Sequence, residues 1–485
     1  MRSVAFAALG AVVLGGGVVA WRTATFEAPA SAQAVPLAPA VAVDAEAAAR
    51  RLGESIRFQT VNNQNPADNR WEEWDKLHAW LETSYPAAHK AMTREIVGNR
   101  TLVYSWPGSD PKLEPIILMA HQDVVPITAG SEKDWKHAPF GGELADGYVW
   151  GRGAVDDKGS LIALFEAMET LAAQGYAPKR TIYLVSGADE ETRAGGAKVA
   201  ADLLKQRGVK AWFVLDEGFS GTTKDPLTGK AVARILVAEK GYATLRVTAE
   251  AEGGHSSAPP RETAVVSLAK AVTRIAERPY PTRIDGAVSQ GYQALVPQAS
   301  FQDRVMLANL WLFEPFMARK LEKSPAAAAT LHTTIAPTML EGAPKENVLP
   351  QKAIARINFR LAPGDTSDKV MARSKAAVAD LPVELSWEKP PFEATAVSST
   401  TSDPWKILST LVADTSGATV APGLMRAGTD SWFFRPIATD TYLFTPVILS
   451  PEEEKMVHGT NERVSVKALG EMVTFYSRLI RTAAG

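Results

Sequence analysis

Apolar runs alternate with helix-like patterns between residues 115 and 215 of the chain. The runs predict strands at Pro115–His121, Thr181–Ser186 and Ala211–Leu215, and the patterns between them predict helices at Ser160–Gln174 and Gly195–Arg207. Regular alternation of strands and helices is typical of α/β domains, because helices connect the parallel strands. The predicted fold class is therefore α/β, with a mixed, largely parallel sheet flanked by helices and with functional residues at the carboxyl ends of its strands.

Helices are also predicted on both sides of this region. They cover Ala45–Phe58, Arg70–Tyr85 and Val466–Arg481, and Ser465 is placed to cap the last of them. The pattern changes at Tyr242, after which two alternating strands and one helix are predicted at Ala243–Glu250, Ala353–Leu361 and Glu262–Glu277. We therefore expect a catalytic domain at residues 44–241 and 364–485, interrupted by a smaller α+β domain at residues 242–363.

The segment Pro279–Ala329 shows no regular period. It contains a cluster of aromatic residues, Trp311, Phe313 and Phe316. Two interpretations are open: the segment is an insertion with its own small core, or its aromatic side chains form a wall for an apolar substrate.

The N-terminus carries an uncharged, mostly apolar run from Ser3 to Trp21, between Arg2 and Arg22. A membrane-spanning helix needs about 20 apolar residues, whereas a signal peptide core has about 7–15. Residues 1–22 are therefore predicted to be an uncleaved membrane anchor or a cleaved export signal, and both place the rest of the chain outside the cytoplasm (periplasmic or extracytoplasmic). The Ala- and Pro-rich residues 23–43 are predicted to be a flexible tether.

Composition narrows the possible chemistry. The apolar fraction is 46%, the charged fraction is 22% and the formal net charge is −2, so neither nucleic acid nor an anionic membrane surface is indicated as a partner. The chain contains no cysteine, which excludes disulfides and thiolate metal sites. A metal ion would have to be held by His, Asp and Glu, a ligand set that favours zinc, cobalt or manganese.

Such ligands follow the predicted strands. His121 ends the first strand and Asp123 follows it, Asp156 lies in a glycine-rich turn, and the strand Thr181–Ser186 leads into Asp189-Glu190-Glu191. Three consecutive carboxylates repel one another unless cations or protons offset their charge. Two more candidates are Asp216 after the third strand and His458 before the closing helix. Two histidines and several carboxylates suit a pair of metal ions that share a bridging carboxylate.

The order His121-x-Asp123, Asp156-Asp157-Lys158-Gly159, Glu190-Glu191, Asp216 and His458 resembles the motifs of the co-catalytic zinc carboxypeptidases and aminoacylases. This family includes glutamate carboxypeptidase, succinyl-diaminopimelate desuccinylase and aminoacylase. The resemblance extends from about Ala45 to the C-terminus. It looks most like the carboxypeptidase S branch, which includes relatives that act on N-fatty-acyl amino acids.

The resemblance implies a role for each motif residue. Two zinc ions are expected per chain, with His121 and Asp216 on one, Glu191 and His458 on the other, and Asp156 as the bridge. The peptide bond after Asp156 is expected to be cis. Asp123 is expected to orient His121 from behind. Glu190 is expected to be the general base, which takes a proton from the metal-bridging water and passes it to the leaving amine.

The resemblance also implies that the inserted domain is a lid that carries a dimer interface. His255 is expected to stabilise the oxyanion, in dimeric relatives often from the neighbouring subunit. Asn347 and Arg360 are expected to hold the substrate carboxylate or the oxyanion, and Gly428 belongs to the glycine-rich loop 427–431, whose N–H groups meet the substrate. Four other histidines match no family motif and are expected to be structural or at the surface: His78, His89, His137 and His332.

The expected function is hydrolysis of a peptide or N-acyl bond next to a free carboxylate, as in a carboxypeptidase. The alternative within the same chemistry is a deacylase of N-acyl, including fatty-acyl, amino acids. A metal-binding protein without catalysis is the alternative from another class. The partners expected are a small peptide or N-acyl amino acid as substrate, a membrane only through the N-terminal segment, and a second copy of the chain.

Overall fold

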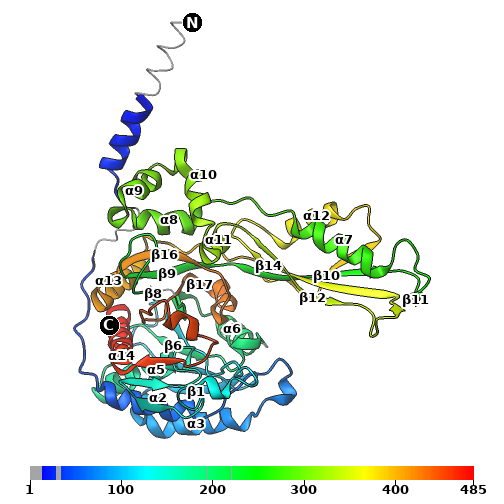
Figure 1. The fold of residues 1–485 in the computed structure, drawn as a ribbon. Helices are drawn as coiled ribbons and strands as arrows, with labels where there is room; N and C mark the ends of the chain where they lie inside the picture. The colour runs from blue at the N-terminus through cyan, green and yellow to red at the C-terminus, as the bar shows by residue number, and fades with distance from the viewer. Residues whose placement is uncertain (1–13, 29–33, 194, 220) are drawn as a thin grey trace.

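A computed structural model describes residues 14–28, 34–193, 195–219 and 221–485. Figure 1 shows a large α/β unit, an arm formed by a second sheet, and a group of helices beside the start of this arm. The N-terminal helix projects from this group of helices, on the side away from α2 and α3 (Figure 1).

The larger sheet has nine strands in the order β1-β2-β6-β3-β7-β17-β9-β16, with β8 paired to β9. The strands are β1 (Thr93–Val97), β2 (Thr101–Trp106), β3 (Ile116–Met119), β6 (Ile182–Ser186), β7 (Ala211–Asp216), β8 (Gly221–Thr222), β9 (Val232–Glu239), β16 (Thr419–Met425) and β17 (Ala438–Leu443). β6, β3, β7 and β17 are parallel neighbours, and β1 and β2 add an antiparallel edge. The predicted α/β fold with a mixed sheet is confirmed.

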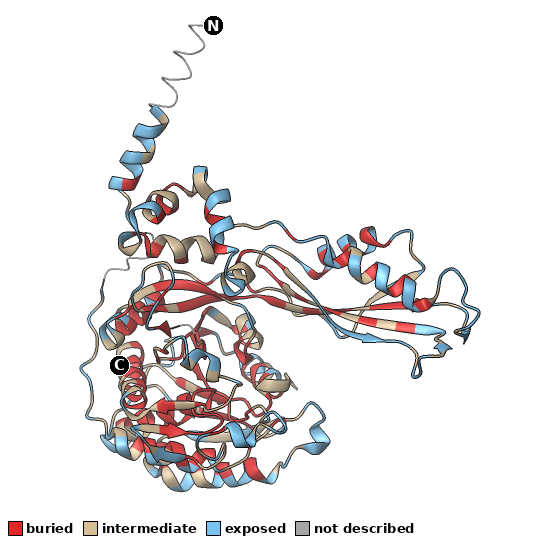
Figure 2. Ribbon diagram, in the orientation of Figure 1, coloured by how far each residue is buried: buried red, intermediate tan, exposed pale blue. Residues whose placement is uncertain are grey.

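Helices cover both faces of this sheet because the central strands are apolar on both sides. In β3, Ile116 and Leu118 belong to the core on one face, whereas Ile117 and Met119 belong to the core on the other. The first face is covered by α2 (Ala45–Ile56), α4 (Pro86–Ala91), α5 (Lys158–Ala173), α13 (Asp403–Ser416) and α14 (Val466–Ala484), and the second by α6 (Gly196–Gln206). Figure 2 shows how completely the central strands are buried.

Capping residues mark where two of the predicted helices begin. Asp44 accepts a hydrogen bond from the N–H of Ala47 at the start of α2, and Ser465 accepts one from Ala468 at the start of α14. The amphipathic helix predicted after Arg70 is α3 (Glu72–Ser84), with Trp74, Leu77 and Leu81 buried, as its spacing predicts.

The second sheet has four antiparallel strands in the order β12-β14-β10-β15. They are β10 (Gly241–Glu250), β12 (Thr334–Glu341), β14 (Lys352–Leu361) and β15 (Val383–Trp387), and α7 (Ala264–Ala276) and α12 (Ser367–Ala377) cover one face. Both α12 and β15 lie beyond the predicted boundary at residue 363. That boundary therefore falls inside the unit built on this sheet, because β15 completes the sheet by pairing with β10.

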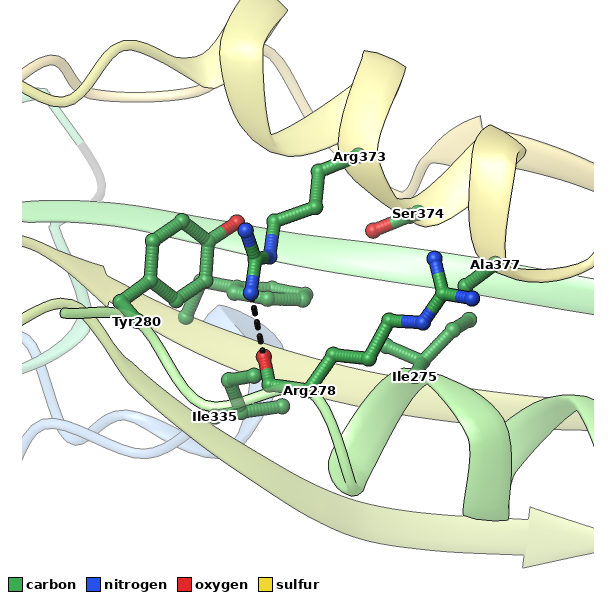
Figure 3. A pocket seen from close by; sticks show the side chains of 8 residues that line it. Ile275, Arg278, Tyr280, Ile335, Arg373, Ser374 and Ala377 are labelled. Atoms are coloured by element: carbon green, nitrogen blue, oxygen red, sulfur yellow. Dashed lines mark hydrogen bonds between the residues drawn. The ribbon is translucent and has the colours of Figure 1, made fainter.

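Figure 3 shows how α12 is joined to the chain that follows α7. The guanidinium of Arg373 donates hydrogen bonds to the backbone oxygens of Pro279 (2.9 Å) and Arg278 (3.3 Å) and lies over the ring of Tyr280. The small hollow at this point is lined by Ile275, Ile335 and neighbouring side chains of the arm. None of its lining residues is a candidate metal ligand, so it belongs to the packing of the arm.

The segment Pro279–Ala329, for which no regular structure was predicted, is largely helical. It contains α8 (Gly286–Ala294), α9 (Phe301–Ala308), α10 (Leu310–Leu321) and most of α11 (Pro325–Leu331). Pro315 lies inside α10 and the helices are short, which explains why the sequence shows no clear period. Leu307, Met317 and Leu331 form a core of their own, as the first of the two interpretations states, whereas Trp311 and Phe316 are each 60% exposed.

The N-terminal segment is helical over residues 14–24, and residues 1–13 of the predicted anchor lie outside the described residues. In the described part of the chain, no helix combines the length and the apolar character needed to cross a membrane. The prediction of a flexible tether is wrong for residues 34–43. Val35, Leu37 and Val41 pack against the main core, and Ala38 is hydrogen-bonded to Thr482 and Arg478 of α14, because apolar side chains recur along this extended segment.

Candidate metal centre

Three neighbouring parallel strands bring the candidate residues to one edge of the larger sheet. β6, β3 and β7 lie side by side. His121 follows β3, Glu190 follows β6 in the short 3-10 helix η3 (Glu190–Thr192), and Asp216 is the last residue of β7. Because the strands run in the same direction, these residues reach the same edge, although they are far apart in the sequence.

One carboxylate, that of Asp156, contacts both predicted histidine ligands. Its Oδ1 lies 2.9 Å from Nε2 of His121, and its Oδ2 lies 3.1 Å from Nε2 of His458. Oε2 of Glu191 lies 3.3 Å from the same nitrogen of His458. The peptide bond between Asp156 and Asp157 is cis, as predicted. The structure thus brings four predicted ligands together, and each oxygen of Asp156 faces a different histidine, as a bridging ligand requires.

Carboxylates dominate the charge of this group. Hydrogen bonds to Asp156 and Glu191 raise the pKa of His458 to about 10, although burial works in the opposite direction. Burial alone would lower the pKa of His121, but the charge of Glu217 and then the contacts with Asp123 and Asp156 raise it well above its ordinary value. Both histidines are therefore surrounded by anionic groups that favour a positive charge at this place.

A small sheet places the His458 loop against the glycine-rich turn. β18 (Arg463–Ser465) pairs with β5 (Tyr148–Trp150), which pairs with β4 (Glu143–Ala145). The turn that follows β5 can approach closely because Gly153 has a φ of +87°, and a Cβ there would lie 2.7 Å from Val124. The glycines of the motif therefore serve close backbone packing beside Asp156.

Asp123 connects His121 to the predicted general base. Its Oδ1 lies 3.4 Å from Nδ1 of His121 and accepts a hydrogen bond from the N–H of Glu190 at 3.2 Å. Its Oδ2 accepts from the N–H of Glu191 at 3.1 Å and from Nδ2 of Asn62 at 2.9 Å. The backbone oxygen of Asp123 lies 2.9 Å from the same Nδ1, so Asp123 fixes the His121 ring with its backbone and the start of η3 with its completely buried carboxylate.

The carboxylate of Asp216, the other predicted ligand, is bound by backbone N–H groups. Its two oxygens accept hydrogen bonds from the N–H groups of Glu217 (2.9 Å) and Ser431 (2.8 Å). The neighbouring Glu217 has Oε1 3.5 Å from Nε2 of His121, and His121, Asp157 and Glu217 form a group with ligand atoms within 4.8 Å of one another. Glu217 was not singled out in the sequence, because adjacent carboxylates look alike there. The role of Asp216 as a ligand stays a prediction.

The donor set fits cations. A second group of possible ligand atoms, within 4.8 Å of one another, belongs to His121, Asp156 and Glu191. Among the described side chains, several buried carboxylate oxygens here have no hydrogen-bond partner: both of Asp157, Oε1 of Glu191 and Oδ2 of Asp430. Burial, followed by neighbouring charges, raises the pKa values of Asp157, Glu190, Glu217 and Asp430 well above the ordinary range. Bound metal ions would pair these oxygens and offset their mutual repulsion.

A buried ion pair supports the loop that carries Asp156. Glu462 is fully buried, and its Oε1 accepts hydrogen bonds from the N–H groups of Gly153 (3.1 Å), Val155 (2.9 Å) and Asp156 (3.1 Å). Its Oε2 lies 2.7 Å from the guanidinium of the equally buried Arg152. Neither residue was predicted to have a role. The sequence offered one signal, a charged residue in each of the two motifs around Asp156 and His458.

The predicted substrate residues divide into two places. Arg360 is on β14 near the start of the arm, where its guanidinium lies over the ring of Tyr242, and Gly428 lies against Arg193, two residues after Glu191. His255 and Asn347 lie at the far end of the arm, where β11 (Gly254–His255) pairs with β13 (Val348–Leu349) (Figure 1). Within one chain, His255 is exposed and is not brought to the metal centre.

The other histidines have structural partners, as expected. Nε2 of His78 is 2.6 Å from Oε1 of Gln122, and His89 lies between the backbone oxygen of Tyr85 and the hydroxyl of Tyr104. His137 pairs with Glu143, and the backbone oxygen of His332 accepts a hydrogen bond from Lys240. None of them takes part in the metal centre.

Comparison with known sequences gives consistent matches. Residues 117–482 match the model of the peptidase family M20/M25/M40. A Dictyostelium discoideum protein named "Probable carboxypeptidase S-like 2" is 35% identical over 442 residues, which cover 89% of this chain and 84% of that protein. The human N-fatty-acyl-amino acid synthase/hydrolase PM20D1 is 38% identical over 399 residues, which cover 80% of this chain and 78% of that protein.

Solved structures show the same fold. An M20 family metallo-carboxypeptidase from Sulfolobus solfataricus matches with a TM-score of 0.66 at 17% identity and covers 90% of this chain and 98% of its own. Human carnosine dipeptidase 1 matches with a TM-score of 0.64 at 14% identity and covers 91% of this chain and 99% of its own.

Proposed function

Because the chain belongs to the peptidase family M20/M25/M40, we propose that it is a dinuclear zinc hydrolase that cleaves an amide bond next to a free carboxylate. The family and the carboxypeptidase relatives make the chain a metal-dependent amide hydrolase. The observation that carries the finer proposal is the Asp156 carboxylate, which faces His121 with one oxygen and His458 with the other. Cobalt or manganese could occupy the same donor set.

Glu190 is the general base in this proposal. Burial, followed by the charges of Asp430 and Glu191, raises the pKa of Glu190 well above its ordinary value. Its carboxylate is therefore suited to take a proton from water and to pass it to the leaving nitrogen. His121, Asp156, Glu191 and His458 would hold the zinc ions, and bound zinc would supply Lewis acidity toward the substrate carbonyl and toward water.

The proposed substrate class is based on the names of the relatives. We propose a peptide or N-acyl amino acid with a free carboxylate, and Arg360 and the N–H groups of the loop around Gly428 are placed to bind it. The alternative, an N-acyl amino acid deacylase, is favoured by the names of several relatives at 34–38% identity, which are N-fatty-acyl-amino acid synthase/hydrolases. The two activities differ in the acyl group accepted and share the catalytic residues.

We further propose that two copies of the chain complete each site. His255 and Asn347 lie together at the end of the arm, where the N–H of Ser256 binds the backbone oxygen of Asn347 at 3.2 Å. The arm holds both residues away from the metal centre of their own chain (Figure 1). A homodimer in which His255 of the partner subunit reaches the centre would supply the oxyanion donor.

The N-terminal segment is proposed to attach the enzyme to a membrane from outside the cytoplasm. The support is the uncharged run from Ser3 to Trp21, together with the exposure of Leu14 (73%) and Trp21 (66%) on the helix that projects from the body (Figure 2).

The proposed function is tested by an assay of the full chain on two series of substrates. One series contains dipeptides with blocked N-termini, and the other contains N-acyl amino acids of increasing chain length. We expect turnover that a chelator abolishes and zinc restores. Replacing Glu190 by Gln should lower kcat by roughly 100- to 10,000-fold, because a general base contributes about that much. The series with the higher kcat/KM identifies the natural substrate class.

A surface variant, Glu132→Gln, provides the matched control, because Glu132 is exposed and is not one of the candidate ligands. It should keep full activity. Turnover that survives complete removal of metal, or full activity in the Glu190 variant, would disprove the mechanism.

A further inference from the structure

Two arginine side chains meet at one aromatic ring beside the metal centre. The guanidinium carbon of Arg360 lies 4.7 Å from the centre of the Tyr242 ring. The guanidinium carbon of Arg193 lies 5.7 Å from the same ring and 5.3 Å from the ring of Phe392. Among the residues that the structure describes, neither guanidinium has a hydrogen-bond or ion-pair partner. Two cations are therefore held close together without an anion.

The backbone and a glycine hold Arg193 in this position. Arg193 follows η3 in a left-handed conformation, with a φ of 51°. A Cβ on Gly428 would lie only 2.0 Å from a guanidinium nitrogen of Arg193. Gly428 thus leaves open the space that this guanidinium fills. The loop predicted to meet the substrate is therefore in direct contact with Arg193.

The carboxylate of Glu239 does not neutralise this pair. Glu239 is fully buried and feels the charge of Arg193, but its own partners are the N–H of Thr429 at 2.9 Å, the hydroxyl of Ser431 at 3.3 Å and the guanidinium of Arg435 at 3.3 Å. Arg435 accounts for the negative charge of Glu239. The positive charges of Arg193 and Arg360 are left for a ligand.

Two guanidiniums that lie close together without an anionic partner form a suitable site for a carboxylate. Burial, followed by the charge of Arg193, lowers the pKa of Arg360, which shows that the two guanidiniums disfavour each other. An anion bound by both would relieve this repulsion. The planar fork of each guanidinium matches the two oxygens of a carboxylate. Both guanidiniums lie over the Tyr242 ring, a cation–π contact that does not use their N–H donors.

We propose that Arg193 and Arg360 bind the free carboxylate of the substrate together, so that Arg193 determines the preference for substrates with this group. The inference rests on the proposed function, because it assigns the carboxylate end of the substrate whose amide bond is cleaved at the metal centre. Arg193 follows Glu191 by two residues, and its guanidinium lies against Gly428 of the loop predicted to meet the substrate.

The test compares the zinc-loaded full chain with its Arg193→Gln and Arg193→Lys variants. The substrates are N-acetylphenylalanine and N-dodecanoylphenylalanine, each as the free acid and as the C-terminal amide. For the free acids, Arg193→Gln should raise KM roughly 10- to 100-fold, the range expected for losing a charge-assisted hydrogen bond, and should change kcat much less. KM for the amides should stay unchanged, and Arg193→Lys should restore part of the affinity. Arg207→Gln removes an exposed arginine that pairs with Glu95 and serves as the matched control.

Equal increases in KM for acids and amides would assign Arg193 a packing role and overturn the proposal. So would an unchanged KM for the acids. If the wild-type chain hydrolyses none of the substrates, the proposed function fails separately. Calorimetric binding of the acid and amide forms to the wild type and to Arg193→Gln then decides the present question, because selective loss of acid binding supports the proposal and equal binding overturns it.

Discussion

Glu462 shows how much of the metal centre depends on a residue that touches no candidate ligand side chain. It accepts hydrogen bonds from the backbone N–H groups of three residues of the Asp156 loop and forms an ion pair with Arg152. Burial is the largest influence on its pKa, which is raised although Arg152 opposes the shift. Both charges have been removed from water, so each depends on the other.

We predict that Glu462→Gln lowers the free energy of unfolding by about 3 kcal/mol, because the buried guanidinium of Arg152 loses its counter-ion. Urea unfolding in the presence of a chelator measures this effect without a contribution from bound metal. The control is Glu95→Gln, which removes an exposed pair with Arg207 and should cost at most about 1 kcal/mol. Similar losses in the two variants would contradict the role given to the buried pair.

At the scale of secondary-structure elements, Lys240 lies between β9 and β10, where the chain passes from the larger sheet into the sheet of the arm. Its Nζ donates hydrogen bonds to the backbone oxygens of Ala329 and His332, both at 2.8 Å, and so ties the end of α11 to this crossing. Burial, followed by the charge of Arg360, lowers the pKa of Lys240 to about 7.

This shift gives a prediction for stability against pH. The unfolded chain keeps the proton on Lys240 up to about pH 10.5, whereas the folded chain releases it near pH 7. Between these values the unfolded state binds more protons, so folding becomes more favourable as the pH rises. Relative to Lys240→Met, the wild type should gain roughly 1 kcal/mol per pH unit between pH 7 and 10. Urea unfolding at several pH values measures the difference, with the exposed Lys112→Met as control, and a difference that does not change with pH would refute the prediction.

At the scale of the whole molecule, the arm separates His255 from the metal centre. The antiparallel pairing of β10 with β14 makes the arm long and straight, and the paired β11 and β13 carry His255 and Asn347 at its end. One chain therefore presents a metal centre without its predicted oxyanion donor and a donor without a metal centre. Two chains related by a twofold axis can complete two such sites.

Complementation between two inactive variants tests this arrangement. His255→Ala and Glu190→Gln chains should each have little activity alone. Co-expressed in equal amounts with different tags, they should regain about a quarter of the wild-type activity, because half of randomly formed dimers are mixed and each mixed dimer has one complete site. A mixture no more active than its components would show that His255 does not act across a dimer.

The local sequence pattern by itself determined much of the secondary structure and the order of the site motifs. The apolar strands, the capped helices α2 and α14, and the motif order from His121 to His458 could all be read from the chain. They depend on neighbouring residues and on periods of two or 3.6, which a sequence displays directly. The α/β fold followed from the same patterns, because alternating strands and helices leave few possible connections.

Only the tertiary structure determined the contacts between residues that are distant in the sequence. The chain could not show whether Asp216 or Glu217 faces His121, because one position along a strand end reverses the direction of a side chain. Nor could it show that Glu462 supports the Asp156 loop, that residues 34–43 pack against α14, or that Arg193 meets Arg360 at Tyr242. Each of these contacts joins separate elements, and only the packing of the sheets and helices brings such elements into contact.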